Sequence, residues 1–437
     1  MPSTCGAVRW TGLLGGTPTG RLTAALCHTG IEGVTTMTGK LRVGIIGSGA
    51  IALQIHAPGY LALPDDCELV ACCDVVPERA KAFAERFATA QWFTDYHEML
   101  ALPELDAVSV CTPPFMHRDA TVAALDAGKH VLCEKPMAMN VAEAKDMASA
   151  AERAGKVLTI GHQQRFSPEA QAVKRAVEAG ELGDIYYAKT AALRSRGAPT
   201  WGVFHVKKLN GGGPLIDIGV HALDVTLWLM GNPRPVAVFG ATYMALAHQP
   251  GLQNRWGKIN VEEYDVEDLA AAFVRFDNGA TLVLETSWLL QMTERGVVHT
   301  QLFGTEGSAR LDPFQIVHDV DGVPEDVTPE LPRPEPAPAQ QAKGDAEAKK
   351  DQLQETPKPK ASATQVRHAE DAPAGTKGTP TGEDDTWRRQ PAVGRFVQAA
   401  LGRVEPLVKP EETLNVQRVM DALYQSAESG QLAEITD

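Results

Sequence analysis

From Leu41 onward, short apolar runs alternate with segments of helical character, and this alternation limits the folds that are open to the chain. The runs LRVGII, ELVACC, DAVSVCT, HVLCEKP and KVLTIG have the length of strands rather than of helices. Strands separated by helices join through crossovers into a parallel sheet that is covered on both faces. We therefore predict a doubly wound α/β domain over residues 41–162, with helices near 50–62, 77–88, 117–127 and 140–154.

After about residue 162 the pattern changes to several strands with little helix between them. A helix is predicted near 167–179 and a strand at 184–193, and the turns FDNGAT and GTEGSA are typical of hairpins. The segments VGRFVQAALG and TLNVQRVMDALYQSAESG predict amphipathic helices near the end of the chain. Residues 163–332 and 385–437 therefore predict a second α/β domain, with a large, mainly antiparallel open sheet and helices on one face.

Two further segments differ from both domains. Residues 1–40 predict a disordered N-terminal extension, and because Met37 shortly precedes the first strand, residues 1–36 could also be an upstream mis-start. Residues 333–384 are rich in Pro, Ala and charged residues, and no aromatic residue occurs between Phe314 and Trp387. Such a stretch cannot bury enough apolar surface to offset its ordering entropy, which predicts a disordered insertion whose removal leaves folding and turnover nearly intact.

Composition narrows the range of partners. The net charge of -14 disfavours nucleic acid or an anionic membrane surface as the main partner, because both are polyanions. No apolar run approaches the length of a membrane span. The seven cysteines form no C-x-x-C pair, which favours buried thiols over disulfides or a metal site. We expect a cytoplasmic protein without a metal, whose partner is a small molecule.

The first strand leads into the sequence GIIGSGAIA, which carries G-x-G-x-x-A at Gly47, Gly49 and Ala52. In this setting the first glycine allows a tight turn, the second lets a pyrophosphate approach the backbone, and the small third residue packs helix against strand. Asp74 ends the next strand, where a carboxylate accepts the ribose hydroxyls of NAD and repels a 2′-phosphate. The pattern predicts binding of NAD in preference to NADP, and Arg79 is the residue that would accommodate NADP.

Two other strands end in polar residues at the same edge of the predicted sheet. CTPPFMH places His117 at a helix start, where it is either a structural residue or a cofactor contact. CEKP places Glu134, Lys135 and Pro136 after a buried strand. Ligands of such sheets bind at the carboxyl ends of the strands, so Lys135 would face the nicotinamide pocket unless it is an ordinary solvated lysine.

The stretch GGGPLIDIGVHALDVTLWLMG, residues 211–231, is apolar except for Asp217, His221 and Asp224. On a helix their spacing of four and three puts the three side chains on one face. One satisfied histidine is common in a structural helix, but two carboxylates with an imidazole indicate a site. We expect the three glycines to let the chain approach the cofactor cleft.

In order along the chain, GSGAIA, Asp74, CTPPFMH, EKP, GHQQRFSP and GGGPLIDIGVHALD resemble the Gfo/Idh/MocA family, over roughly residues 41–332 and 385–437. The resemblance implies a Rossmann domain followed by an α/β domain whose open sheet commonly supports homodimers or homotetramers. The family's E-K-P lysine corresponds to Lys135, and its D-x-x-x-H pair corresponds to Asp217 and His221. In relatives the Lys-Pro peptide bond is often cis.

The resemblance implies an NAD-dependent oxidoreductase that transfers hydride between a secondary alcohol of a sugar, cyclitol or related polyol and the nicotinamide. Imidazole titrates near neutrality, so His221 is the candidate base, although Lys135 remains open for that role. Lys135 would stabilise alkoxide charge, Asp217 would orient His221 or hold a substrate hydroxyl, and Asp224 would lie behind them. The predicted substrate contacts are Arg194, Trp201, Asp217 and His221. The predicted cofactor contacts are Gly47, Gly49, Ala50, Ile51, Asp74, Arg79, Thr112, Pro113, His117, Glu134, Lys135, Gln163 and Arg165.

Two alternatives use the same motifs. Some branches of the family are NAD-dependent glycosidases, which oxidise a ring carbon transiently and return the hydride. A nonenzymatic dinucleotide-binding regulator is the other alternative, and the presence of Lys135, Asp217 and His221 argues against it. The particular sugar and the direction of the reaction are not encoded in these motifs.

Overall fold

The computed structural model describes residues 39–331 and 386–436 of the chain. The predicted extension, apart from its last two residues, and the predicted insertion at 333–384 lie outside this range. No helix in the described part of the chain is long and apolar enough to cross a membrane.

The first domain contains a parallel sheet of six strands in the order β3-β2-β1-β4-β5-β6. The order reverses between β1 and β4, and ligands of such sheets bind at this switch point. All four residues of β4 are buried, as expected of a strand with helices on both sides. The strand bounds are β1 Leu41–Ile46, β2 Cys67–Cys73, β3 Gln91–Phe93, β4 Ala107–Val110, β5 His130–Cys133 and β6 Leu158–Ile160.

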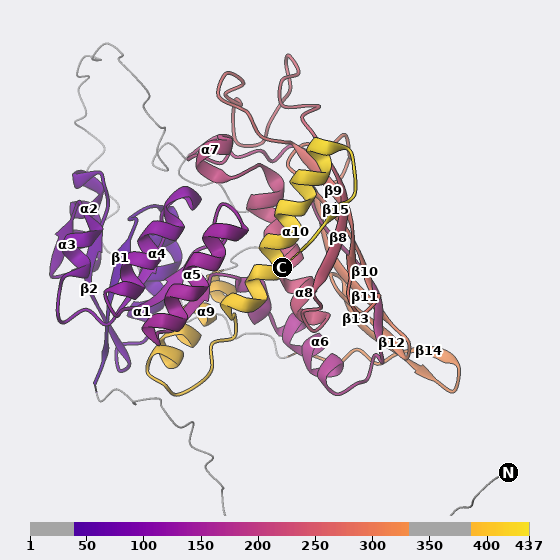
Figure 1. Ribbon diagram of the computed structural model, residues 1–437, viewed down its shortest axis with the longest axis horizontal. Coiled ribbons are helices and arrows are strands. Elements are labelled where there is room, and N and C mark those ends of the chain that lie inside the picture. Colours follow the sequence, from indigo (N-terminus) through magenta and orange to yellow (C-terminus); the bar gives the residue numbers. More distant parts are fainter. Residues whose placement is uncertain (1–38, 332–385, 437) are drawn as a thin grey trace, which may run out of the picture. The chain divides into compact units, whose positions relative to one another are not determined.

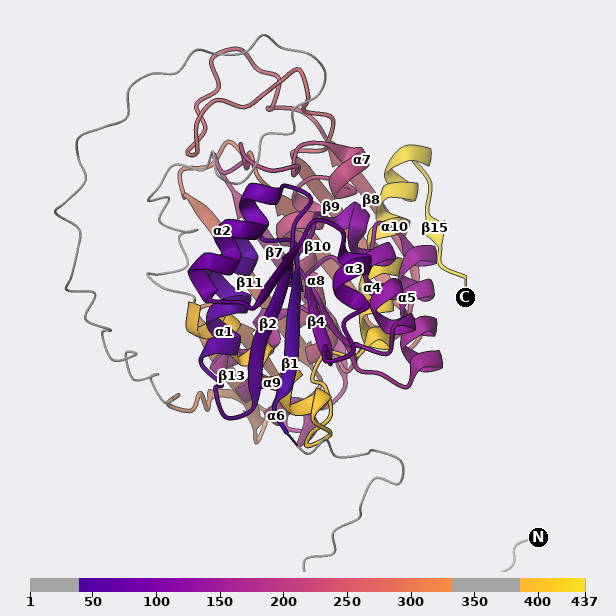
Figure 2. The ribbon, with the colours of Figure 1, turned by 90° about the vertical axis from the view of Figure 1, so that its left-hand side faces the viewer.

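Helices cover both faces of this sheet, with α1 and α2 on one side and α3, α4 and α5 on the other (Figure 2). The long helix α5 shows why these segments are helical, since Asn140 caps its start by accepting a hydrogen bond from Glu143 N at 3.0 Å and Gly155 ends it with a φ of 59°. The bounds are η1 Ala52–His56, α1 Ala57–Leu61, α2 Pro77–Phe87, α3 Tyr96–Leu100, η2 Pro114–Met116, α4 His117–Asp126 and α5 Val141–Ala154.

The second domain contains a nine-stranded sheet in the order β14-β13-β12-β11-β7-β10-β9-β8-β15. Figure 1 shows this sheet nearly edge-on. Every pair of neighbours is antiparallel except β7 and β10. The predicted turns join β9 to β10 and β11 to β12. The bounds are β7 Ile185–Arg194, β8 Pro235–Tyr243, β9 Leu269–Phe276, β10 Thr281–Ser287, β11 Gly296–Gly304, β12 Gly307–Leu311, β13 Phe314–Val320, β14 Val323–Asp326 and β15 Ala433–Glu434.

One face of this sheet is covered by α6, α8 and α10, whose apolar side chains share a core with the strands (Figure 1). Helix α8 carries nine buried residues of ten and lies at the centre of that core. The predicted fold class, a Rossmann sheet plus a mainly antiparallel open sheet, is confirmed. The remaining bounds are η3 Gln163–Phe166, α6 Pro168–Glu178, α7 Lys207–Asn210, η4 Leu215–Gly219, α8 Val220–Leu229, α9 Thr386–Ala400 and α10 Pro410–Ser429.

Helix α9 departs from the predicted domain division. The sequence placed residues 385–437 in the second domain, but Val393, Phe396 and Val397 of α9 are buried in a core formed with β1, β2 and α1. The amphipathic pattern correctly predicts that this segment is helical. Such a pattern does not specify which hydrophobic core the apolar face of the helix packs against. The end of the chain therefore crosses back to the first domain before α10 returns to the second.

Candidate active site

The turn after β1 has the geometry that a dinucleotide requires. Gly47 has a φ of 93°, and a Cβ atom there would lie 2.8 Å from the backbone oxygen of Cys111, so only glycine fits. A Cβ at Gly49 would meet nothing within 4 Å, which leaves the backbone open to an approaching group. Ala50 and Ile51 follow directly, where the helical segment begins.

Asp74 is held at the end of β2, beside this turn. Its carboxylate accepts hydrogen bonds from Ser48 N at 2.9 Å and from Val76 N at 3.0 Å, and Arg79 Nη1 lies 3.9 Å from Oδ1. Within the described residues, Ser48 Oγ, Thr112 Oγ1 and Arg79 Nη2 are buried without a hydrogen-bond partner. Pro113 adjoins Thr112 in the turn after β4. These unsatisfied polar atoms around an open turn fit a bound dinucleotide.

Behind the E-K-P motif lies a buried polar network. His56 Nε2 lies 2.9 Å from Glu134 Oε1, and His56 Nδ1 lies 2.9 Å from the hydroxyl of Ser109, which also contacts the Tyr60 hydroxyl at 2.6 Å. Burial alone would raise the pKa of Glu134, but the hydrogen bond with His56 and the charge of Lys135 outweigh it, so that pKa is lowered. Glu134 Oε2 also accepts a hydrogen bond from Lys135 N at 3.2 Å. The network therefore fixes the backbone from which Lys135 projects.

His117 is the first residue of α4, and its side chain is fully buried. Its ring nitrogens lie 2.7 Å from the Pro136 carbonyl oxygen and 2.8 Å from the Thr112 carbonyl oxygen. Burial is the largest influence on His117 and lowers its pKa. Of the two roles left open by the sequence, this geometry favours the structural one, in which His117 ties the turn after β4 to the E-K-P motif.

Lys135 and Asp217, which lie far apart in the sequence, form a close pair. The Lys135 ammonium donates to the Asp217 carbonyl oxygen at 2.8 Å and to Oδ1 at 3.1 Å. The other carboxylate oxygen accepts a hydrogen bond from Trp288 Nε1 at 3.1 Å, and Arg194 Nη1 lies 3.8 Å from it. The Lys135–Pro136 peptide bond is cis. The pair joins the end of β5 in the first domain to η4 in the second.

Contrary to the sequence prediction, Asp217, His221 and Asp224 do not lie on one face of a single regular helix. Asp217 lies in η4, a π-helical turn, whereas His221 and Asp224 lie in α8. The wider turn changes the angular spacing, so Asp217 contacts Lys135 while Asp224 is fully buried against other partners. The His221 ring lies edge-on to His162, with a centroid distance of 6.4 Å. Burial lowers the pKa of His162 to about 4, so His162 is neutral at physiological pH.

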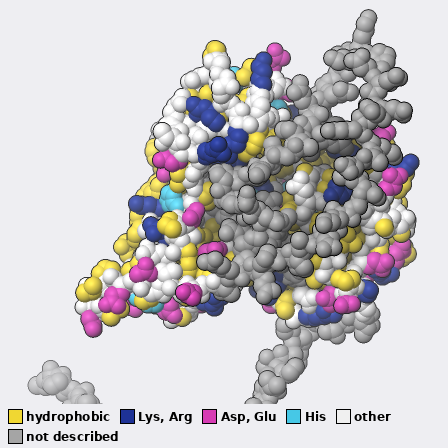
Figure 3. Space-filling model, turned by 180° about the vertical axis from the view of Figure 1, so that it is seen from behind, with side chains coloured by type: hydrophobic (Ala, Val, Ile, Leu, Met, Phe, Trp, Pro, Cys, Tyr) yellow, Lys and Arg dark blue, Asp and Glu magenta, His cyan; other side chains and the backbone are white. Residues whose placement is uncertain are grey.

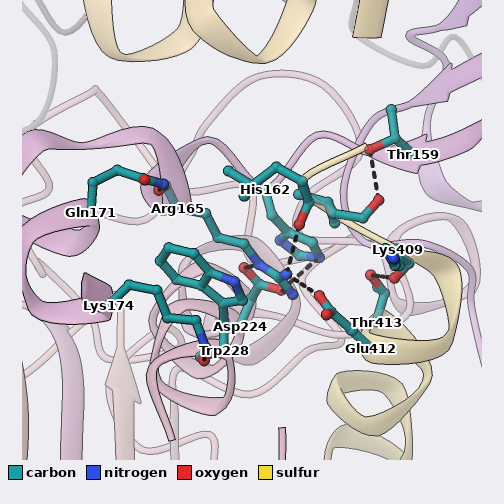
Figure 4. A network of polar contacts seen from close by, with 12 residues as sticks. Thr159, His162, Arg165, Gln171, Lys174, Asp224, Trp228, Lys409, Glu412 and Thr413 are labelled. Atoms are coloured by element: carbon teal, nitrogen blue, oxygen red, sulfur yellow. Dashed lines mark hydrogen bonds and ion pairs between the residues drawn. The ribbon is translucent and has the colours of Figure 1, made fainter. Parts of the chain in front are cut away.

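Figure 4 shows Asp224 paired with Arg165, together with the other residues that surround Arg165. Arg165 donates to the two Asp224 carboxylate oxygens at 2.9 Å and 2.7 Å and also pairs with Glu412 of α10. The side chain of Arg165 is fully buried. Gln163, also predicted as a cofactor contact, is buried beside a small cavity lined by His56 and Glu134. This geometry gives Arg165 a structural role between η3, α8 and α10.

Arg194 and Trp201, two of the four predicted substrate contacts, both lie against the side chain of Trp256. The Arg194 guanidinium lies 5.2 Å from the centre of the Trp256 ring, and the Trp201 ring meets Trp256 at 5.1 Å. Three residues of the site were not predicted from the sequence, namely Trp256, Trp288 and His56. The first two lie in connecting loops without a motif, but His56 follows the glycine-rich turn in QIHAPG and could have been noted there.

The glycines before η4 serve a different purpose from the one predicted. A Cβ at Gly213 would lie 2.2 Å from the backbone oxygen of Glu267, and one at Gly212 would lie 1.9 Å from the Tyr424 hydroxyl. Gly213 N donates to Glu267 Oε2 at 2.9 Å, and the Tyr424 hydroxyl donates to Oε1 at 2.9 Å. The glycines therefore let the chain pack against its own domain, which positions Asp217.

In the described residues, no group of three or more His, Cys, Asp or Glu side chains is arranged to hold a metal ion. The candidate site therefore consists of an open glycine turn, a fixed carboxylate at the end of β2, and Lys135 paired with Asp217, which Arg194 also approaches.

Comparisons with known proteins agree with this arrangement. Residues 41–162 match the "Oxidoreductase family, NAD-binding Rossmann fold", and residues 170–310 match the "GFO/IDH/MocA C-terminal domain". The chain is 39% identical to D-glucoside 3-dehydrogenase of Escherichia coli over 64% of this chain and 80% of that protein. It is 28% identical to scyllo-inositol 2-dehydrogenase (NAD(+)) of Bacillus subtilis over 64% of this chain and 77% of that protein.

A solved structure shares the fold. Levoglucosan dehydrogenase in complex with NADH superposes with a TM-score of 0.70 at 21% sequence identity, covering 91% of this chain and all of that one. Both family matches fall on the domains that the structure shows, and the match to the Escherichia coli dehydrogenase spans both. The chain belongs to the GFO/IDH/MocA family of oxidoreductases.

Proposed function

We propose that this protein is an NAD-dependent dehydrogenase that oxidises a secondary alcohol on the ring of a sugar, glycoside or cyclitol. The observation that carries the proposal is the contact of Lys135 with Asp217, next to the turn of α8 that holds His221. The likeness to D-glucoside 3-dehydrogenase and to scyllo-inositol 2-dehydrogenase supports a polyhydroxylated ring as the substrate.

Lys135, His221 and Asp217 have separate roles in the proposed reaction. When bound, the nicotinamide would accept the hydride that leaves the carbinol carbon. Lys135 would donate a hydrogen bond to the substrate oxygen and stabilise the negative charge that develops there. His221 would take the hydroxyl proton, since a neutral imidazole is a competent base near neutral pH. Asp217 would hold the Lys135 side chain in one position, because its carboxylate and carbonyl oxygens both accept from Nζ.

NAD is the proposed cofactor in preference to NADP. The Asp74 carboxylate is fixed by two backbone hydrogen bonds and would accept the ribose hydroxyls of NAD. A 2′-phosphate would place like charge beside it, although Arg79 close by would offset part of the repulsion.

A panel of substrates tests the proposal. Purified protein with NAD is supplied with glucosides, free aldoses, inositols and sugar acids, and the formation of NADH is followed by its absorbance. We expect NADH to accumulate with at least one ring polyol in proportion to the oxidised product. Binding of NAD without turnover on the whole panel would contradict the proposal and favour a dinucleotide-binding regulator. Cleavage of a glycoside without net NADH would favour a glycosidase.

A further inference from the structure

Arg194 is largely buried next to the candidate catalytic pair, yet it makes few polar contacts. Its guanidinium carries five N–H donors, and in the described residues one hydrogen bond is formed, from Nη1 to the Gly197 carbonyl oxygen at 3.3 Å. Its side chain is 13% exposed. A Cβ at Gly197 would lie 2.6 Å from Arg194 Cδ, so the glycine makes room for the arginine stem. The remaining donors are available to a ligand.

Arg194 has no close carboxylate partner among the described residues. Asp217 is the carboxylate beside it, at 3.8 Å, but Asp217 Oδ1 already binds the Lys135 ammonium at 3.1 Å. The Arg194 guanidinium is therefore largely buried with only a distant negative charge, an arrangement that favours an anionic ligand. Burial lowers the pKa of Arg194, Asp217 opposes that shift, and the charge of Arg255 adds to it.

A second arginine lies near Arg194, since both guanidinium groups lie against the ring of Trp256. Arg255 Nη2 also donates to the carbonyl oxygen of Arg295 at 3.2 Å. Figure 3 shows Lys and Arg side chains near the top of the view, with Asp and Glu side chains beside them. An anion bound to Arg194 would be attracted by the charge of Arg255 as well.

Trp256 supplies a flat apolar surface at the same place. Arg194 and Arg255 lie 5.2 Å and 5.8 Å from the centre of its ring, and Trp201 packs edge-on at 5.1 Å. Trp256 is itself 9% exposed, so the stacked arrangement is part of the folded core of these loops. Stacking holds the planar guanidinium in one orientation, with its donors along the edge.

We propose that the substrate is a ring polyol that carries one carboxylate, and that Arg194 binds this carboxylate. This inference rests on the proposed function of the same site. A carboxylate matches the two-pronged geometry of a guanidinium and supplies the close negative partner that Arg194 lacks among the described residues. A hydroxyl could accept a hydrogen bond from Arg194 but would bring no negative charge to it. A uronic acid or its glycoside has the required chemistry.

Matched pairs of substrates test the inference with the full-length protein and NAD. D-glucuronate is compared with D-glucose, and methyl β-D-glucuronide with methyl β-D-glucoside. We expect kcat/KM to favour the acid of at least one pair by about tenfold or more, which corresponds to roughly 1.4 kcal/mol. Arg194→Gln should lower kcat/KM for that acid, mainly through KM, by about tenfold or more beyond any loss that it causes with the neutral partner. Arg194→Lys should restore part of the loss.

A matched control is Arg153→Gln, because Arg153 is an exposed arginine whose pair with Asp126 lies on the surface. This variant should behave as wild type with both members of each pair. If the neutral sugar is used as well as the acid, or if Arg194→Gln lowers both equally, the inference is wrong.

Binding separates this inference from the proposed function. Titration calorimetry measures the binding of D-glucuronate and D-glucose to the protein saturated with NADH. Tighter binding of D-glucuronate that is lost in Arg194→Gln would support the carboxylate site even if no sugar of the panel is oxidised. Equal binding of both sugars, or no binding of D-glucuronate, would overturn it.

Discussion

At the scale of single residues, the site depends on side chains that are fixed before any ligand arrives. Lys135 is held by Asp217, and the backbone at Lys135 is held by Glu134, which in turn contacts His56. Asp74 is fixed by the backbone N–H groups of Ser48 and Val76. Preorganised charges of this kind cost no reorganisation during the reaction.

Asp74 should set the cofactor preference. We expect kcat/KM with NAD to exceed that with NADP by about tenfold or more, because the carboxylate would lose its ribose hydrogen bonds and face a phosphate of like charge. Asp74→Ser should narrow this ratio, while Glu85→Ala on the exposed side of α2 should not change it. Steady-state kinetics with both cofactors measures the ratio. Equal values in the wild-type protein would show that Arg79, not Asp74, governs the choice.

Motifs made Lys135, Asp217 and Asp74 predictable, because each follows a strand or a helix turn at a recognisable position. His56, Trp256 and Trp288 were not predictable in the same way. Their roles come from contacts across the fold, such as the hydrogen bond from Trp288 to Asp217 at 3.1 Å, and no local pattern encodes these contacts. His117 and Arg165 illustrate the converse, since both lie in motifs but are turned into the protein interior.

At the scale of elements, Arg165 ties η3 to α8 and α10 through Asp224 and Glu412. The expected helix from residue 211 begins instead with the π-helical turn η4, which separates Asp217 from Asp224. Hydrophobic periodicity predicted that the segment is helical but not this change of turn, because the π turn depends on the packing of Gly212 and Gly213. Likewise, the amphipathic pattern of α9 predicts a helix but does not predict that this helix packs in the core of the first domain.

Asp224→Asn should destabilise this junction strongly. The change leaves the fully buried Arg165 without one of its two carboxylate partners, and breaking a buried ion pair costs about 3–5 kcal/mol. The free energy of unfolding from urea titration measures the loss. Asp277→Asn is the matched control, because Asp277 pairs with Arg234 on the surface at 3.4 Å and should lose less than about 1 kcal/mol. Equal losses in the two variants would contradict the structural role given to Arg165.

At the scale of the whole molecule, stability should depend on two histidines that are shielded from water, His162 fully and His130 in part. Burial lowers the pKa of His162 and of His130 to about 4 in the folded protein, against about 6.5 for an unfolded histidine. Between about pH 6.5 and pH 4 the unfolded chain binds protons at these histidines, whereas the folded protein does not. The free energy of unfolding is therefore fully retained above about pH 6.5 and decreases as the pH falls towards 4. For His162, whose pKa is also influenced by the nearby charges of Asp224, Arg165, Glu134 and Lys135, the free energy of unfolding should decrease by about 3 kcal/mol.

Urea unfolding at pH 7 and at pH 4.5 measures this dependence. His162→Asn should reduce the difference between the two values, because the asparagine does not titrate. An unchanged difference would show that His162 is not protonated over this range.

The face of the large sheet that α6, α8 and α10 do not cover should join copies of the chain, as the resemblance to the family implied. Phe273 pairs in register with Phe239 on β8, and their side chains are 43% and 55% exposed. Adjacent apolar side chains of this size on one sheet face favour association. Light scattering should show a homo-oligomer that Phe273→Asp dissociates, while Trp92→Asp, at an exposed aromatic in the other domain, leaves it intact. A monomeric wild-type protein would contradict this prediction.

The central claim is that Lys135 and His221 carry out chemistry rather than hold the fold or the cofactor. The most direct measurement is kcat of Lys135→Met and His221→Asn, beside the affinity of each variant for NADH by fluorescence. We predict normal NADH binding with a loss of about 10² to 10⁴ in kcat for each, and loss of the acid limb of the kcat/KM profile in His221→Asn. Near wild-type turnover in both variants would contradict the account, and turnover retained in His221→Asn alone would transfer the role of base to Lys135.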